Sequence, residues 1–328
     1  MQWRTPRFWQ YRGFLAHALL PFAMLYCFVY RALRWRSISA YQSKIPVICV
    51  GNVVIGGAGK TPTAIALASL LKNKGYKLAF ISRGYGGTLA KTNATLVDAT
   101  THTAQEVGDE PLLLANHAPT YIASNRVEAV KLAEKNPDIN VLIMDDGLQN
   151  ETVKKSLSFL VMHGKYGVGN GFLFPAGPLR ESLLCALRRV DAILINGDAS
   201  PQLLKQFSNK PRFGMEIKIE SSLDKTPPYI AFAGIAHPQR FFDLLEKEQY
   251  QVAKQVAFAD HYPYKHDDLM PLIDEANKQS AQLVTTEKDW VRLPNSLKDK
   301  VKIFAISHAF IDKKDVSNWL DVILSKGK

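Results

Sequence analysis

Residues 53–62, VVIGGAGKTP, contain the residue types that hold a phosphate group. Three glycines permit a tight curl of the backbone, so that several N–H groups can point inward at an anion. Next to them, Lys60 supplies a cation and Thr61 a hydroxyl that can bind Mg²⁺. We therefore predict a phosphate-binding loop whose contacts come from Ile55, Gly56, Gly57, Ala58, Gly59, Lys60, Thr61 and Pro62.

The loop departs from the standard pattern, Gly-x4-Gly-Lys-Ser/Thr, because Val54 stands where that pattern has its first glycine. The deviant Gly-Gly-x-Gly-Lys-Thr loops of partitioning and targeting ATPases have the same shape. Those ATPases usually carry a lysine just before the two glycines, where this chain has Ile55. A membrane-associated ATPase of that kind is the alternative function that the loop by itself allows.

Two acidic residues, Asp145 and Asp146, end the apolar run VLIMDDG. When an apolar strand ends beside a phosphate loop, an acidic residue at its end reaches the Mg²⁺ of the bound nucleotide. The loop and this strand end together predict phosphoryl chemistry that depends on a nucleoside triphosphate.

Four further polar motifs each have two interpretations. Arg83 of SRGY either binds phosphate or is a surface arginine, and Asp109 of GDEP is explained adequately as a helix N-cap. Arg180 and Glu181 of GPLRE either contact a substrate or form a surface pair. His261 of DHYPY lies between aromatic residues, where a histidine is more often structural than catalytic.

The order of these motifs resembles that of the tetraacyldisaccharide 4′-kinase family. The resemblance covers nearly the whole chain and rests on GNVVIGGAGKTP (51–62), SRGYGG (82–87), GDEP (108–111), DDGLQ (145–149), GPLRE (177–181), FAGIAHPQRF (232–241), FADHYPY (258–264) and TTEKD (285–289). Enzymes of that family use ATP and Mg²⁺ to phosphorylate the 4′-hydroxyl of the lipid A disaccharide precursor. Their loop normally lacks the first glycine, so Val54 agrees with the resemblance.

The resemblance also implies roles for individual residues. It implies that Asp109 and His261 act at the reacting hydroxyl, and that Mg²⁺ is held by Thr61, Glu110, Asp145 and Asp146. It implies contacts to the glycolipid by Ser82, Arg83, Tyr85, Gln149, Arg180 and Glu181. The role of TTEKD stays open.

Alternating short apolar runs and helical segments must position these residues. Strands are expected at 45–50, 78–82, 121–123, 141–144, 159–162 and 192–195, with helices at 61–74, 110–117, 126–136 and 182–188. This alternation predicts an α/β fold of the P-loop NTPase type, a parallel sheet with helices on both faces. A second set of strands (229–233, 282–285, 302–305) and helices (239–246, 267–278, 315–324) predicts a smaller α/β domain.

The domain boundaries follow from these patterns. We expect an N-terminal anchoring helix at 1–36, a kinase domain at 37–200, a proline-rich linker at 201–228 and the smaller domain at 229–328. Cys27, Cys49 and Cys185 are scattered without CxxC pairing, which argues against a disulfide framework or a structural zinc site.

Charge is distributed unevenly along the chain. Residues 1–97 hold thirteen Lys or Arg and no acidic residue, although the whole chain has 41 basic and 30 acidic residues. Within this basic region, residues 13–30 are uncharged and are flanked by Arg4, Arg7, Arg12, Arg31, Arg34 and Arg36 and by Trp3, Trp9 and Trp35. Basic and aromatic residues around an apolar helix suit a lipid headgroup zone, so the segment predicts a membrane anchor.

The expected partners are therefore a glycolipid and an anionic membrane surface, at the cytoplasmic face of the inner membrane and with peripheral or monotopic attachment. Nucleic acid is disfavoured, because an apolar run interrupts the basic residues. No obligate protein partner is inferred. The run contains His17 and Pro21 and is short for a membrane span, which leaves open whether it crosses the bilayer.

Overall fold

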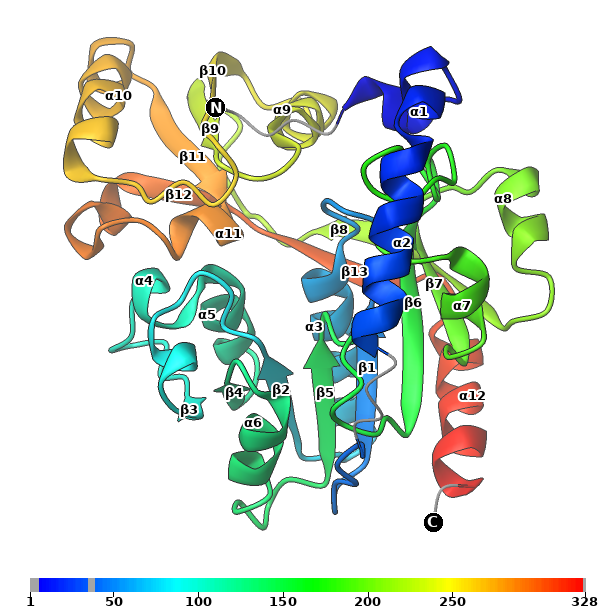
Figure 1. Cartoon of the computed structure of the whole chain (residues 1–328). Helices are drawn as coiled ribbons and strands as arrows, with labels where there is room; N and C mark the ends of the chain where they lie inside the picture. The colour runs from blue at the N-terminus through cyan, green and yellow to red at the C-terminus, as the bar shows by residue number, and fades with distance from the viewer. Residues whose placement is uncertain (1–5, 35–38, 327–328) are drawn as a thin grey trace.

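The computed structural model describes residues 6–34 and 39–326, and its larger sheet has the strand order β13-β8-β7-β6-β1-β5-β2-β4-β3 (Figure 1). The strands of this sheet are β1 (Val47–Gly51), β2 (Leu78–Ser82), β3 (Thr95–Leu96), β4 (Thr120–Ile122), β5 (Val141–Asp145), β6 (Leu157–His163), β7 (Ala192–Asn196), β8 (Arg212–Ile219) and β13 (Ile306–Phe310). Neighbouring strands are parallel, apart from β3 against β4 and β13 against β8 at the two edges. The predicted α/β class with a mostly parallel sheet is confirmed.

Helices cover both faces of the larger sheet, because successive side chains of each strand point to opposite sides. Ile48 and Val50 of β1 pack with α3 (Lys60–Asn73) and α12 (Lys313–Lys326), and Leu114 of α5 (Asp109–Ala115) joins this core. Val47 packs instead toward α6 (Arg126–Ala133), and Cys49 packs toward α7 (Leu183–Leu187) and α8 (Pro201–Gln206). The short α4 (Ala104–Val107) and the 3-10 turn η2 (Leu89–Lys91) form a small apolar cluster beside β4.

A second sheet of four parallel strands has the order β10-β9-β11-β12. It consists of β9 (Tyr229–Ala233), β10 (Val252–Ala257), β11 (Gln282–Thr286) and β12 (Val301–Phe304). Helix α9 (Pro238–Lys247) packs on one face and α10 (His266–Lys278) on the other, with α11 (Glu287–Trp290) and η3 (Asn295–Lys300) between β11 and β12. We call this sheet with its helices the smaller lobe, and the nine-stranded sheet with its helices the larger lobe.

The stretch predicted to be a linker, 201–228, contains regular structure. Its residues form helix α8 and strand β8, and β8 pairs in parallel with β7 inside the larger sheet. The prediction was wrong because the four prolines lie outside the strand: Pro201 starts α8, Pro211 precedes β8, and Pro227 and Pro228 precede β9. Residues 220–228 alone connect β8 of the larger sheet to β9 of the smaller sheet.

The expected boundary of the C-terminal unit is also wrong beyond β12. Strand β13 leaves the smaller lobe and pairs antiparallel with β8, from Ile306 opposite Ile219 to Phe310 opposite Met215. Helix α12 then packs Val316 and Leu320 into the core of the larger sheet. The chain therefore finishes in the larger lobe, where Figure 1 shows α12, in red, beside β6.

The N-terminal segment folds as η1 (Arg7–Gln10), α1 (Phe14–Ala18) and α2 (Leu20–Arg34). Within the part of the chain that the structure describes, no helix combines the length and the apolar character needed to span a bilayer. One side of the segment is docked: Trp9 is buried and its Nε1 donates to the carbonyl of Pro175 at 3.0 Å. The other side exposes large apolar residues, namely Phe14, Leu15, Phe22, Met24, Leu25, Phe28 and Val29. Trp3, Arg4, Trp35 and Arg36 lie outside the described residues.

Candidate active site

The predicted phosphate loop lies between β1 and α3, as the sequence indicates. Gly59 takes the N-cap position with a φ of 78°, and the helix begins at Lys60, one residue before the predicted start. The loop is held from β7, two strands away from β1 in the sheet, since Asn196 Nδ2 donates to the carbonyl of Ala58 at 2.9 Å. A helix N-terminus behind a glycine-rich curl presents backbone N–H groups to an anion.

Thr61 and Asp145 meet at the buried base of this loop. Thr61 Oγ1 donates to Asp145 Oδ2 at 2.9 Å, and Asp145 Oδ1 is buried with no hydrogen-bond partner among the described residues. Burial raises the pKa of Asp145 to about 7, helped by the charges of Glu110 and Asp146. A buried, unpartnered carboxylate oxygen beside a hydroxyl fits a hard divalent cation, which prefers oxygen ligands.

Asp146 has a different environment although it is the next residue. Its carboxylate accepts two hydrogen bonds from Arg180 Nη1, each 3.2 Å long, and lies 3.6 Å from Lys60 Nζ. Burial alone would raise its pKa, but the charges of Lys60 and Arg180 outweigh this effect and lower it. The structure thus places Lys60 and Arg180 together above the loop, with Asp146 between them.

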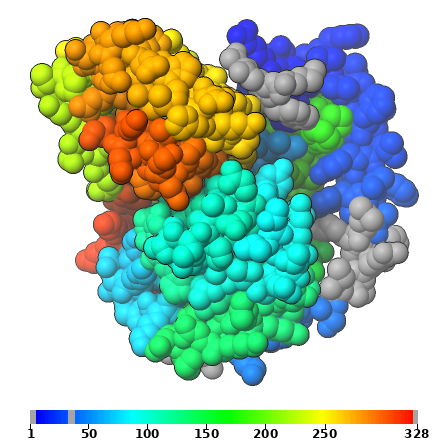
Figure 2. All heavy atoms as spheres, turned by 90° about the vertical axis from the view of Figure 1, so that its left-hand side faces the viewer, coloured from blue at the N-terminus to red at the C-terminus, as the bar shows by residue number. Residues whose placement is uncertain are grey.

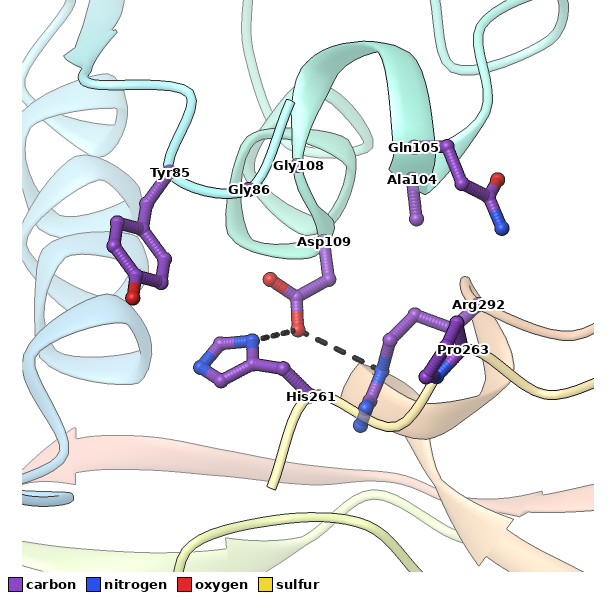
Figure 3. Close-up of a pocket in the computed structure, with 9 residues that line it drawn as sticks. All are labelled: Tyr85, Gly86, Ala104, Gln105, Gly108, Asp109, His261, Pro263 and Arg292. Carbon is purple, nitrogen blue, oxygen red and sulfur yellow. Dashed lines mark hydrogen bonds and ion pairs between the residues drawn. The ribbon is translucent and has the colours of Figure 1, made fainter. Parts of the chain in front are cut away.

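Asp109 of the larger lobe and His261 of the smaller lobe meet where the two lobes face each other (Figure 3). Asp109, at the start of α5, is 5% exposed, and its Oδ2 lies 2.8 Å from His261 Nδ1. Burial would raise the pKa of Asp109, but the bond from His261 and the charges of Lys288 and Arg292 lower it to about 2. The carboxylate is therefore ionised at neutral pH and accepts this hydrogen bond from His261.

A cavity of about 140 Å³ opens directly on this pair. Asp109 and His261 form part of its wall, together with Tyr85, Gly86, Ala104, Gln105, Gly108, Pro263 and Arg292 (Figure 3). The exposed ring of Tyr85 lies edge-on to His261, with ring centroids 6.0 Å apart. The backbone of His261 has a φ of 57°, in the left-handed region that is uncommon for a histidine.

The residues expected to contact a glycolipid divide into two groups. Gln149, Arg180 and Glu181 lie together, because Gln149 Nε2 donates to Glu181 Oε1 at 2.9 Å and to the carbonyl of Asn52 at 2.8 Å. Ser82 is buried at the end of β2, whereas Arg83 and Tyr85 are exposed just beyond it. Glu181 is itself buried and paired with Arg189. Its contacts are therefore within the protein, where Gln149 links it to Asn52 at the start of the phosphate loop.

Of the four predicted metal ligands, the structure brings only Thr61 and Asp145 into direct contact. Asp146 is occupied by Lys60 and Arg180, and Glu110 Oε1 lies 3.4 Å from Lys288 Nζ. Within residues 6–34 and 39–326, no three His, Cys, Asp or Glu side chains gather closely enough to hold a metal by themselves. This arrangement agrees with Mg²⁺ chemistry, in which one or two carboxylates are completed by phosphate oxygens and water.

Comparison with known proteins identifies the family. Residues 15–325 match the family described as Tetraacyldisaccharide-1-P 4'-kinase. The chain belongs to this family. It is 39% identical over 315 residues to the Tetraacyldisaccharide 4'-kinase of Rhodospirillum rubrum, a match that covers 94% of each chain. It is 43% identical to the protein of the same name from a strain of Methylorubrum extorquens, over 82% of this chain and 83% of the relative.

A solved structure agrees with this membership of the tetraacyldisaccharide-1-P 4'-kinase family. The fold is similar to the crystal structure of LpxK from Aquifex aeolicus in complex with ATP, with a TM-score of 0.76 and 27% sequence identity. The similarity covers 94% of this chain and 99% of the Aquifex chain, so it includes both sheets.

Sequence reasoning assigned no role to four residues of this kinase-family site, although Lys288 lies in the TTEKD motif that it singled out. Lys288 and Arg292 reach Asp109 Oδ2 at 3.8 and 3.6 Å, Asn196 supports the loop, and Arg126 is buried near the two aspartates. Burial, together with the charge of Arg83, lowers the pKa of Arg126 to about 10. One available signal was position, since Asn196 ends a strand at the same sheet edge as Asp145. Lys288 and Arg292 follow β11 of the smaller sheet, so their position did not indicate that they would meet Asp109 of the larger lobe.

Proposed function

We propose that the chain transfers the γ-phosphoryl group of ATP to the 4′-hydroxyl of a tetraacyldisaccharide 1-phosphate, giving lipid IVA in lipid A biosynthesis. The observation that carries this proposal is the meeting of Asp109 and His261 at a cavity, next to Glu110, whose charge acts on Asp145 at the base of the phosphate loop. A sugar hydroxyl is a poor nucleophile near neutral pH, so a positioned proton acceptor assists its attack. The family relatives carry the name of this kinase activity.

His261 is the residue that takes the proton in this proposal. Because the pKa of Asp109 is lowered to about 2, its carboxylate can only accept, and the hydrogen of their bond must lie on His261 Nδ1. In the neutral imidazole, Nε2 is then the acceptor. Asp109 Oδ2 is already shared by His261, Lys288 and Arg292, so it orients the imidazole and stabilises its protonated form.

The phosphate loop and its neighbours bind the nucleotide. The N–H groups around Gly59 and the ammonium of Lys60 hold the phosphates, and Arg180 approaches the same space from the next motif. Thr61 and Asp145 would hold Mg²⁺, which when bound neutralises charge on the phosphate oxygens. Closure of the two lobes over ATP and acceptor excludes water from the reaction.

The activity is tested by mass spectrometry on the disaccharide 1-phosphate, dispersed in detergent and incubated with Mg-ATP. We expect one added phosphate at the 4′ position. Lys60→Ala should lower the rate by roughly 10²–10³-fold, since it removes the cation nearest the transferred group. The control is Lys135→Ala, at an exposed lysine that belongs to none of the site motifs. ATP turnover that needs only bare membranes, with no phosphate added to the glycolipid, would favour the targeting ATPase instead.

We also propose that the N-terminal segment attaches the enzyme to the cytoplasmic face of the inner membrane, where ATP and the amphiphilic acceptor meet. Helix α2 has 15 residues, and its length of ~22 Å is short of the ~30 Å hydrocarbon core, which favours attachment within the interface. The exposed apolar face of α1 and α2 lies among basic residues that attract anionic lipids.

Vesicle flotation tests this attachment. Deletion of residues 1–36 would also remove Trp9 and Tyr26, which donate hydrogen bonds to the carbonyls of Pro175 and Arg180. These bonds support the segment that carries Arg180, so point variants are a cleaner test. Phe14→Ser, Phe22→Ser and Phe28→Ser combined should release most of the protein from vesicles that contain anionic lipid. Leu96→Ser, at an exposed apolar residue of β3, is the matched control. Equal flotation of the triple variant and the control would contradict the proposal.

A further inference from the structure

A second cavity, of about 230 Å³, adjoins the phosphate loop and shares no lining residue with the cavity at Asp109. Residues 54–58, in the first part of the loop, form one of its walls. Gly59, Lys60 and Thr61, at the anion-binding end of the loop, do not line it. The cavity therefore lies beside the loop but outside the part that would hold the nucleotide phosphates.

Three further segments complete the walls of this cavity, which we call the basic pocket. The N-terminal segment contributes Arg7 of η1, the residues at and after the end of β6 include His163 and Tyr166, and the start of α9 contributes His237 and Arg240. None of the described residues that line the pocket is Asp or Glu. The anchoring segment and both lobes therefore meet around a pocket whose formal charges are all positive.

The two arginines of the basic pocket are not neutralised by the protein. Across the part of the chain that the structure describes, no carboxylate forms an ion pair with Arg7 or Arg240. The guanidinium of Arg240 instead lies over the ring of Tyr166, with Cζ 4.7 Å from the ring centroid. This stacking orients the planar group across the junction of the lobes while its N–H donors stay available for an anion.

The two histidines of the pocket are neutral near pH 7. Burial and the charge of Arg240 lower the pKa of His163 to about 4, and they also lower the pKa of His237 against the opposing charge of Asp260. The backbone N–H of Lys165 donates to His163 Nδ1 at 3.2 Å, so the hydrogen of this neutral ring lies on Nε2. His163 can therefore donate to a ligand, and the positive charge of the pocket comes from the arginines.

Backbone contacts fix the pocket to the anchoring segment on one side and to the reacting pair on the other. The N–H of Asn170 donates to the carbonyl of Trp9 at 2.7 Å, which ties η1 to the residues that follow β6. The N–H of His261 donates to the carbonyl of Gly234 at 3.0 Å, so the segment that leads to His237 lies next to the proposed base. The pocket thus lies between the segment proposed to meet the membrane and the site of transfer.

We propose that the basic pocket binds the phosphate group of a lipid at the membrane surface, beside the reacting site but separate from it. A phosphate supplies the negative charge that the arginines lack as a partner, and its oxygens accept from their N–H groups. Two lipids carry this group at the interface. One is the acceptor, whose 1-phosphate lies at the opposite end of the disaccharide from the 4′-hydroxyl, and the other is an anionic phospholipid of the bilayer. This inference rests on the proposed acceptor and the proposed membrane attachment.

The first test compares the tetraacyldisaccharide 1-phosphate with the same disaccharide lacking that phosphate, in neutral detergent with Mg-ATP and the full-length protein. If the acceptor fills the pocket, Arg240→Gln raises KM for the phosphorylated acceptor by about 10-fold or more and leaves KM for the other nearly unchanged, because charge-assisted hydrogen bonds are lost only with the phosphate. Arg7→Gln, on the opposite wall, should do the same, which keeps the test valid if Arg240→Gln does not fold. Arg212→Gln, at an exposed arginine of β8 outside the pocket, is the control.

The second test measures flotation of the same variants on vesicles of phosphatidylcholine with and without phosphatidylglycerol. An unchanged ratio of the two KM values, with flotation lowered only on vesicles that contain phosphatidylglycerol, would identify a bilayer phospholipid as the source of the phosphate. A wild-type ratio together with wild-type flotation would overturn the proposal. So would an equal rise of KM for both acceptors, as a merely structural role would give, or a rise confined to KM for ATP. Failure of the proposed function is seen separately, because the wild type would then phosphorylate neither acceptor.

Discussion

Asp145 and Asp146 are neighbours in the chain with opposite electrostatic environments. Asp145 is buried under the loop with Thr61 as its partner, and its pKa is raised to about 7. Asp146 lies between Lys60 and Arg180, and its pKa is lowered. The left-handed backbone at Asp146, with a φ of 48°, turns the second carboxylate away from the first. This division leaves Asp145 for a cation and Asp146 for holding two basic side chains.

The first prediction concerns the pH dependence of stability without nucleotide or metal. The pKa of Asp145 is about 7 in the folded protein and ~3.9 in the unfolded chain. The contribution of Asp145 to stability is therefore complete below pH ~3.9 and is lost as the pH rises through 7. Asp145→Asn cannot ionise, yet its amide oxygen can still accept from Thr61. In urea unfolding, the variant should therefore gain on wild type by a few kcal/mol between pH 4 and 8. A constant difference over that range would contradict the buried ionisation.

The second prediction concerns Asp109 and His261 acting as a unit. Asp109→Ala and His261→Ala should each lower kcat by on the order of 10²–10³-fold, because one orients the base and the other is the base. ATP affinity should change little, since neither residue belongs to the phosphate loop. The double variant should be hardly slower than the worse single variant.

The double-mutant cycle needs turnover measurements on three folded variants, checked by thermal unfolding. Fully multiplicative losses would separate the two residues into independent roles. A wild-type rate for His261→Ala would remove that residue from the reaction.

At the scale of elements, the site depends on how α3 begins. The helix starts from Gly59 in the left-handed region, and a Cβ at this position would lie 2.8 Å from Asn196 Nδ2 and 2.9 Å from His308 Cε1. Gly57 differs, because its nearest atom would be Ala236 Cβ at 3.9 Å, and its φ is outside that region. Glycine is therefore required at position 59 by the backbone conformation and the close contacts, whereas neither constraint applies at position 57.

This contrast makes the third prediction. Gly59→Ala should lower the free energy of unfolding by about 2–4 kcal/mol, from the left-handed backbone and the close contacts together. Gly57→Ala should change it by less than ~0.5 kcal/mol. Both are measured by urea unfolding without nucleotide, so that lost phosphate contacts do not enter. Equal effects of the two substitutions would mean that Gly59 is not constrained as described.

At the scale of the whole molecule, the two lobes are joined by two passes of the chain. One runs from β8 to β9, and the other from β12 to β13, which returns the C-terminus to the larger sheet. Figure 2 shows the smaller lobe, in yellow and orange, lying directly on the cyan part of the larger lobe. The ion pairs of Lys288 and Arg292 with Asp109 lie at this junction.

The fourth prediction tests the return of the chain to the larger lobe. Leu320 of α12 is fully buried in the core of the larger sheet, while Val322 of the same helix is 51% exposed. Leu320→Ala should destabilise the protein by about 2–5 kcal/mol, from lost burial and the cavity it leaves. Val322→Ala should cost less than ~0.5 kcal/mol. Similar costs in chemical unfolding would mean that α12 does not complete that core.

The sequence by itself determined most of the elements and the nucleotide half of the site. Residues 78–82 and 229–233 form strands with the predicted bounds, and the start of α3 differs from its prediction by one residue. The phosphate loop and the strand end at Asp145 were predictable for the same reason, because glycine curls, helix starts and apolar strands are encoded over a few consecutive residues.

The tertiary structure alone decided which distant segments meet. Strand β8 was not predicted, because prolines flank it. Strand β13 follows a segment of the smaller lobe but pairs with β8, and the paired residues Ile219 and Ile306 are 87 positions apart in the chain. Likewise, His261 and Lys288 approach Asp109 from another sheet. Local patterns cannot contain such pairings, because strand order and the approach of two lobes depend on how whole faces are buried. The contacts of the proposed base with the opposite lobe are set at that level.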